Sequence, residues 1–221
     1  MSKTVLITGA NRGIGLSLVK EYLGKGDSVI GVCRRSSSEL EATGAQVIDG
    51  VDVSQPEDMK TLLAKLGDKK LDVLINNAGI LRSSSLDDLN YDDIMAQFEV
   101  NAVGPIRVVS ALLNNLGEGS KVALITSRMG SVADNSSGGA YGYRMSKTAL
   151  NAAGKSLSID LKPKGVAVAL LHPGWVSTEM VNFNGQIEPE ESAKGLVARI
   201  DELDLDNSGG FWHTNGEMLP W

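Results

Sequence analysis

Tyr143 and Lys147 are the residues of this sequence best suited to proton transfer. Residues four apart share one face of a helix, so the two side chains would lie side by side. A lysine cation favours the phenolate form of a neighbouring tyrosine and would lower its pKa from about 10. Such a tyrosine can exchange a proton with a carbonyl oxygen near neutral pH. Tyr141 competes for this role, but the residue four positions after it is the uncharged Met145.

A glycine-rich turn joins the first apolar run of the chain to the first helical pattern. Its sequence is Thr8-Gly9-Ala10-Asn11-Arg12-Gly13-Ile14-Gly15. Glycines in this context allow a sharp turn and let the backbone approach a pyrophosphate. The following helix N-terminus offers free N–H groups and a partial positive charge. The segment therefore predicts a nucleotide-phosphate site rather than a purely structural turn.

Basic residues follow the second apolar run, where a dinucleotide site contacts the adenosine ribose. Arg34 and Arg35 come directly after Cys33, and Arg12 lies in the glycine-rich turn. A carboxylate at this position suits a ribose 2′-hydroxyl, whereas arginine suits a 2′-phosphate. We therefore expect NADP(H), with Arg34 and Arg12 at the phosphate. The alternative is a solvated arginine pair at a strand end.

Pro105 marks a defect in a helical pattern that runs roughly from Tyr91 to Leu116. Proline has no N–H, so the carbonyl oxygen of Asn101, four residues earlier, loses its helical donor. A buried carbonyl needs another donor, and ordered water is the natural one. The sequence thus predicts a distorted helix with a water beside Asn101. The alternative is local bending that accommodates the proline alone.

Short apolar runs alternate with amphipathic patterns along the chain. Runs such as Val5-Leu6-Ile7 and Val73-Leu74-Ile75 are rich in β-branched residues, which is typical of strands buried on both faces of a parallel sheet. Residues 59–66 repeat apolar side chains at helical spacing. The alternation predicts a doubly wound α/β sheet with helices on both faces. No linker or repeat is evident, so we expect one domain over residues 1–221.

Composition narrows the function classes. The chain has a formal net charge of −6 and only 5% aromatic residues. Neither nucleic acid nor an anionic membrane is therefore expected as a partner. One cysteine and two histidines argue against a closed zinc site, and we expect no metal. The sequence shows no signal-peptide pattern and no apolar run of about 18 residues, so we expect a cytoplasmic protein.

The glycine-rich turn, the Tyr143–Lys147 pair and an Asn-Asn-Ala-Gly segment at residues 76–79 together resemble the short-chain dehydrogenase/reductase family. The resemblance implies a Rossmann-type fold with a mostly parallel seven-stranded sheet and a nicotinamide cofactor. Combined with the arginines above, it implies that NADP(H) is held by Thr8, Gly9, Asn11, Arg12, Gly13, Ile14, Gly15, Arg34, Asp52, Val53, Asn77, Ala78, Gly79, Tyr143, Lys147, Pro173, Gly174, Val176 and Thr178. From local sequence alone, Asp52-Val53 fits a helix-leading turn equally well.

The same resemblance assigns the catalytic roles. Tyr143 would donate the proton and Lys147 would support it and bind the ribose. Ser127 would hold the substrate oxygen, because it stands three residues before a glycine, as in the family; Thr126 is the fallback. Asn101 would anchor a water that leads to the lysine. His172 precedes a proline turn, and we expect a structural role for it.

Residues 141–147, His172–Val176 and 209–221 are most similar to the C-factor and Sniffer-like carbonyl reductases within the family. This similarity implies hydride transfer between NADP(H) and a small carbonyl or secondary alcohol substrate, such as an aldehyde, ketone or quinone. An NADP(H)-binding sensor or signalling protein with little turnover is the alternative. An epimerase or dehydratase would usually have a tighter glycine turn and a longer C-terminal domain. We also expect a homodimer or homotetramer, paired through the helices near Tyr91 and Tyr143.

The segment Glu179–Glu188 is short for a substrate-covering lid in this family. It separates Thr178 from a helix expected to begin near Pro189. A short lid predicts an open pocket with weak water exclusion. We therefore expect broad substrate tolerance.

Overall fold

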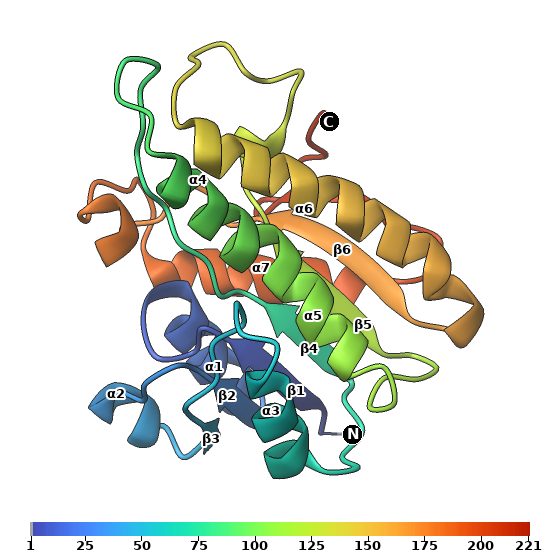
Figure 1. The fold of residues 1–221 in the computed structure, drawn as a ribbon. Helices are drawn as coiled ribbons and strands as arrows, with labels where there is room; N and C mark the ends of the chain where they lie inside the picture. The colour runs from blue at the N-terminus through green and yellow to red at the C-terminus, as the bar shows by residue number, and fades with distance from the viewer. Residues whose placement is uncertain (1) are drawn as a thin grey trace.

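A seven-stranded sheet forms the centre of the computed structural model, which describes residues 2–221 (Figure 1). Its strands are β1 (Thr4–Thr8), β2 (Ser28–Val32), β3 (Gln46–Ile48), β4 (Val73–Asn76), β5 (Lys121–Ile125), β6 (Ala167–His172) and β7 (Phe211–His213). They are ordered β3-β2-β1-β4-β5-β6-β7. Every pairing between these strands is parallel. The predicted doubly wound, Rossmann-type fold is confirmed.

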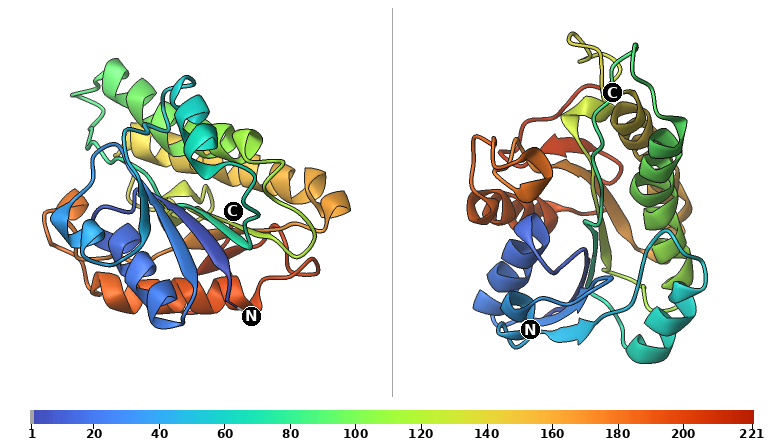
Figure 2. Two further views of the ribbon diagram at one scale, coloured as in Figure 1. Left: turned by 90° about the horizontal axis from the view of Figure 1, so that it is seen from below. Right: turned by 60° about the vertical axis from the view of Figure 1, so that its left-hand side comes forward.

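Helices cover both faces of this sheet, as predicted (Figure 2). They are α1 (Gly13–Gly24), α2 (Ser38–Glu41), α3 (Asp58–Leu66), α4 (Tyr91–Phe98), α5 (Gly104–Ala111), α6 (Tyr141–Asp160) and α7 (Pro189–Glu202). Helices α1 and α7 pack together on one face. Helices α3, α5 and α6 contribute to the core on the other face. This arrangement leaves the carboxyl ends of the strands open to a ligand.

Local sequence sets where several helices begin. Ser37 and Asn90 each accept a hydrogen bond from a backbone N–H of the first turn, at the starts of α2 and α4. Such caps satisfy donors that have no partner within the helix. Pro189 is the first residue of α7, near the predicted position, and Glu190 and Glu191 follow in the first turn. Proline and acidic residues are favourable there because of the fixed φ and the helix dipole.

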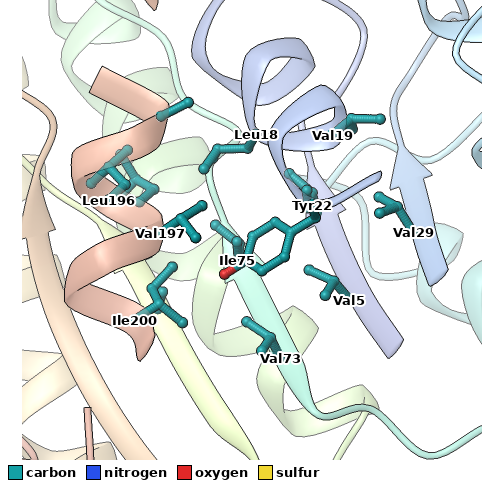
Figure 3. Packing of buried hydrophobic residues seen from close by; sticks show 14 of the residues in the cluster. Val5, Leu18, Val19, Tyr22, Val29, Val73, Ile75, Leu196, Val197 and Ile200 are labelled. Carbon is teal, nitrogen blue, oxygen red and sulfur yellow. The ribbon is translucent and has the colours of Figure 1, made fainter. Parts of the chain in front are cut away.

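The layer between α1, α7 and the sheet is closely packed (Figure 3). Tyr22 and Leu18 of α1 meet Ile75 of β4 and Leu196 and Ile200 of α7, and all five side chains are fully buried. Burial of each aliphatic side chain contributes about 1.5–3 kcal/mol. This layer fixes the first strand and first helix, which carry the glycine-rich turn between them.

The helix around Asn101 is interrupted, as its sequence predicts. Helix α4 ends at Phe98, a π-helix spans Glu99–Val103, and α5 begins at Gly104. The Gly104 N–H donates to the carbonyl of Glu99, five residues earlier rather than four. The helix also ends at Ala111, short of the predicted Leu116, because the chain turns there.

Over residues 2–221, no helix is long and apolar enough to cross a membrane. In the same range, no three or more His, Cys, Asp or Glu side chains come together in a way that could hold a metal ion. Cys33 is buried and carries a free thiol.

Candidate active site

A cleft of about 830 Å³ opens beside β1 and β4, where the strand order of the sheet reverses. Open α/β sheets bind their ligands at this place. Most of the residues predicted to hold the cofactor line it. They are Gly9, Asn11, Arg12, Gly13, Ile14, Gly15, Arg34, Asp52, Val53, Asn77, Ala78, Gly79, Tyr143, Lys147, Pro173 and Thr178.

Three predicted cofactor residues do not line this cleft. Thr8 is buried, and its Oγ1 accepts hydrogen bonds of 3.1 Å from the backbone N–H groups of Asn77 and Ala78. It therefore supports the cleft from behind. Gly174 has a left-handed φ of +88°, and Val176 is buried beside Ile187. These two residues shape the turn that carries the cleft residues Pro173 and Thr178.

Close backbone contacts require the glycines of the turn. A Cβ on Gly15 would lie 2.1 Å from the carbonyl oxygen of Gly9, and Gly9 itself has φ +67°. The Asn77 side chain donates to the carbonyls of Thr8 (3.0 Å) and Gly9 (3.2 Å). The glycine-rich turn and the Asn-Asn-Ala-Gly segment are thus one hydrogen-bonded unit.

Tyr143 and Lys147 lie together at the start of α6, as their spacing predicts. The lysine Nζ lies 5.8 Å from the centroid of the tyrosine ring. Tyr143 is 9% exposed and Lys147 4% exposed. The lysine Nζ donates to the carbonyl of Ile125, at the end of β5, over 2.8 Å. Tyr141, the competing tyrosine, is partly exposed.

Burial, rather than the lysine charge, dominates the pKa of Tyr143. Removal from water raises this pKa to about 12, and the neighbouring Ser127 hydroxyl acts in the opposite direction. Burial also lowers the pKa of Lys147 to about 8. The predicted lowering of the tyrosine pKa is therefore wrong here, because burial disfavours the charged phenolate. Tyr143 keeps its proton at neutral pH.

Ser127, rather than Thr126, adjoins the tyrosine. The Thr126 hydroxyl donates to Asn151 on α6 over 2.6 Å, so it is engaged inside the protein. Ser127 begins the short 3-10 helix that follows β5, and its Oγ accepts from the Met129 N–H at 3.2 Å. Its hydroxyl also interacts with the Tyr143 hydroxyl, so the two groups lie side by side where a substrate oxygen would be expected.

Asn101 is fully buried behind the cleft. Its side chain exchanges two hydrogen bonds of 2.8 Å with the backbone of Ile80 and donates to Ser146 Oγ over 3.0 Å. A Cβ on Gly79 would lie 3.2 Å from the Asn101 Oδ1 and 3.7 Å from the Lys147 Nζ. Asn101 and Lys147 therefore border the same glycine, and the side-chain bonds fix the asparagine in place.

The opposite end of the cleft is cationic and exposed. Arg34 lies 3.6 Å from Asp52, and Arg12 forms an ion pair with Glu179. Both arginine side chains are 65% exposed. Burial alone would raise the pKa of Asp52, but hydrogen bonds from Ser54 and the charge of Arg34 lower it overall. Two guanidinium groups thus stand where the sequence predicts a phosphate.

Several cleft residues were missed by reasoning from sequence. Ile80, Val100, Met180 and Phe183 provide apolar lining, and Glu179 provides an acid. Met180 lies in a single-turn 3-10 helix, Glu179–Val181, and Phe183 in the turn after it, so no extended periodicity marks the direction of either side chain. Backbone strain is the distinguishing feature of this segment, because Phe183 has a φ of +58°. Arg35, which follows Arg34 among the basic residues after β2, also lines the cleft.

His172 lies outside the cleft lining. Its ring packs edge-on against His213, with centroids 5.0 Å apart. Burial lowers its pKa to about 3, so it stays neutral and cannot act as a base that cycles near neutral pH. These observations support the predicted structural role.

Comparisons with known proteins show the family of the chain. A family model for short chain dehydrogenases matches residues 3–188. The chain is 42% identical to 1-hydroxy-2-glutathionyl-2-methyl-3-butene dehydrogenase of Rhodococcus sp. (strain AD45), over 99% of both chains. It is 47% identical to the C-signal of Myxococcus xanthus, over 68% of this chain and 93% of that protein.

Solved structures of carbonyl reductases share the fold over the full length. The Sniffer carbonyl reductase of D. melanogaster matches with a TM-score of 0.91 and 31% identity, covering 100% of both chains. A carbonyl reductase from Pseudomonas aeruginosa PAO1 in complex with NADP matches with a TM-score of 0.87 and 32% identity, again over 100% of both. The chain belongs to the short-chain dehydrogenase/reductase family of oxidoreductases.

Proposed function

We propose that this protein is an NADP(H)-dependent carbonyl reductase or alcohol dehydrogenase acting on small aldehydes, ketones or quinones. One observation carries the proposal: a buried Tyr143–Lys147 pair with Ser127 beside it stands at one end of a cleft whose other end holds two arginines. The first end suits a carbonyl group and the second suits a phosphate. Similarity to an NADP-bound carbonyl reductase supports the same pairing.

The residues of the cleft fit this cofactor. The glycine-rich turn has no room for side chains at Gly15, which would let a pyrophosphate approach the backbone at the start of α1. Arg12 and Arg34 would bind the 2′-phosphate, and Asp52 and Val53 would contact the adenine. When bound, NADPH supplies the hydride, which carries both electrons to the carbonyl carbon.

The side chains of this protein complete the reaction. Ser127 holds the substrate oxygen by hydrogen bond and Tyr143 gives its proton to that oxygen, so that an alcohol forms. The pKa of about 12 keeps the tyrosine protonated before the reaction. Lys147, with a pKa of about 8, would stabilise the tyrosinate after transfer and would hold the ribose of the bound cofactor. A water on the carbonyl of Asn101 would link Lys147 to solvent and restore the proton.

Oxidation of NADPH in the presence of a panel of aldehydes, ketones and quinones tests this proposal. We expect carbonyl-dependent turnover with wild-type protein and none with Tyr143→Phe. Parallel assays with NADH test the choice of cofactor. Failure of every carbonyl to stimulate oxidation, with NADPH demonstrably bound, would contradict the proposed enzyme.

A signalling protein that binds NADP(H) is the second candidate. Identity of 47% to the C-signal of M. xanthus favours it. A pure sensor has no need of a buried proton donor, however, and Tyr143 with Ser127 beside it supports turnover. The carbonyl panel separates the two, because a sensor would bind NADPH without oxidising it.

We also propose a homodimer or homotetramer that pairs through α4 and α6 in the cytoplasm. Apolar side chains stand exposed on these helices, namely Tyr91, Met95, Met145 and Ile159. Burial of such groups between subunits would remove them from water. Light scattering coupled to size exclusion measures the assembly, and a monomer at all concentrations would contradict it.

A further inference from the structure

Arg107 on α5 joins two parts of the molecule that act at different ends of the cleft. Its Nη1 donates to the backbone carbonyl of Val53 over 2.6 Å, and its Nη2 donates to Glu99 Oε1 over 2.5 Å. Val53 lines the cleft next to Asp52, at the end expected to hold adenosine. Glu99 is the first residue of the π-helix that carries Asn101. The Arg107 side chain is only 18% exposed, whereas the Glu99 side chain is 42% exposed, so the contact with Val53 is the more sheltered of the two.

The contact with Glu99 spans the whole π-helix. Residues 99 and 107 are eight apart, which in a regular α-helix corresponds to about 12 Å of rise. Only two extended side chains can bridge such a distance along one helix. A π-helix is rare and less favourable than α-helix, so its surroundings must stabilise it. The Arg107–Glu99 pair is such a support, since it ties the first residue of the π-helix to α5, the helix that follows it.

Close packing reinforces the other contact. A Cβ on Gly104 would lie 3.0 Å from Val53 Cγ2 and 3.2 Å from the Val53 carbonyl oxygen. The first turn of α5 therefore rests directly on the adenosine-side loop. A shift of this loop would press on Gly104 and pull on Arg107. Gly104 directly follows the π-helix and Arg107 binds its first residue, so both contacts would transmit the shift to the π-helix.

We propose that Arg107 is a positioning residue that couples the adenosine end of the cofactor site to the Asn101 turn. It keeps Val53 in place for the adenine and supports the π-helix that carries Asn101. The expected effect of Arg107 on the reaction rests on the proposed function. The expected effect on binding requires only that the cleft accepts an adenosine phosphate.

The first test measures the binding of adenosine 2′,5′-bisphosphate by calorimetry. Arg107→Gln removes the charge and shortens the side chain, and we expect about five- to tenfold weaker binding. Arg107→Lys keeps one donor within reach of Val53 and should recover part of the affinity. The control is Arg199→Gln, which removes another half-buried arginine–glutamate pair, on α7. It should bind the probe as wild type does.

The second test measures kcat and its pH dependence in variants of Arg107 and Glu99. In Arg107→Gln and in the milder Glu99→Gln, we expect kcat to fall and its pH midpoint to move by at least about half a unit, because water reaches Lys147. A purely structural role would lower the melting temperature and leave the probe affinity and the pH midpoint as in wild type, and would overturn the proposal. Weaker probe binding with an unmoved pH midpoint would overturn the coupling.

An inactive wild-type protein would refute the proposed function but not prevent this test. The pH dependence of unfolding between about pH 7 and 9.5 reports the pKa of Lys147 without any turnover. A shallower pH dependence in Arg107→Gln than in Arg199→Gln supports the coupling, and equal dependences overturn it.

Discussion

The two ends of the cleft differ in how far their charged and polar side chains are exposed to water. At the catalytic end, Tyr143, Lys147 and Asn101 are all less than 10% exposed, and Lys147 and Asn101 donate hydrogen bonds to backbone carbonyls. At the adenosine end, Arg12 and Arg34 are 65% exposed and pair with acids across the surface. Burial shifts pKa values at the first end. Solvent screens the charges at the second.

The difference in burial fits two roles, namely the chemical reaction at the catalytic end and the choice of cofactor at the adenosine end. A buried polar group is expensive to leave without a partner, so its geometry is strictly held and a single change is costly. Exposed ion pairs contribute only about 0–1 kcal/mol and rearrange easily. The arginines can therefore exchange an acid for a phosphate at little cost. The catalytic end is built for one geometry, and the adenosine end for exchange between partners.

Tyr143→Phe tests the catalytic end most severely. It removes the proton donor but keeps the buried ring, so the fold and NADPH binding should persist. We expect kcat to fall by about 10²–10⁴-fold, the usual contribution of a general acid. Steady-state kinetics with the best carbonyl, together with NADPH binding by fluorescence, measures both quantities. Turnover at the wild-type rate would refute the assigned role.

Burial of Lys147 should make the free energy of unfolding depend on pH. Its pKa is about 8 in the folded protein against 10.5 as the ordinary value, so between these values the unfolded chain binds more protons. The free energy of unfolding should therefore rise with pH across this window, by up to roughly 3 kcal/mol in full. Urea unfolding at several pH values between about 7 and 9.5 measures the rise. This range stays below the window in which the raised pKa of Tyr143 would act in the opposite direction.

The matched variant for this measurement is Lys147→Met, which fills similar volume without a titratable group. Its stability should rise less with pH between pH 7 and 9.5 than that of the wild type, because the contribution of Lys147 is missing. Its absolute stability is less informative, since the Ile125 carbonyl loses its donor. Equal pH dependence in the two proteins would show that the lysine is not protected from water.

The sequence predicts features that depend on local spacing, but it does not predict burial or contacts between distant segments. The glycine-rich turn, the Tyr143–Lys147 proximity and the helix defect at Asn101 all follow from spacings within a few residues. Depth of burial does not, so the sign of the tyrosine pKa shift was wrong. Contacts between distant segments were also missed, such as Arg12 with Glu179, 167 residues apart, and Arg107 with Val53, 54 residues apart. No local pattern encodes such pairs.

Arg34→Asp probes the adenosine end. A charge-assisted hydrogen bond is worth about 1.5–3 kcal/mol, so NADPH should bind at least about tenfold more weakly. A carboxylate at this position suits a ribose 2′-hydroxyl, so NADH should lose little affinity or gain some. Titration with both cofactors gives the ratio of their Kd values. An unchanged ratio would show that Arg34 is a solvated surface residue.

Glu179→Gln is the mildest change and sharpens the contrast between the two ends. Glu179 competes for Arg12, and their exposed pair is worth no more than about 1 kcal/mol. Its loss should free the arginine for the 2′-phosphate and tighten NADPH binding by up to about fivefold, while kcat at saturating cofactor stays within about twofold. Added salt should shrink the gain, because exposed charges are screened. Glu202→Gln removes an exposed acid from a pair on α7 and serves as the control. Weaker NADPH binding in Glu179→Gln would reverse the interpretation, because the acid would then hold Arg12 in its binding position rather than compete for it.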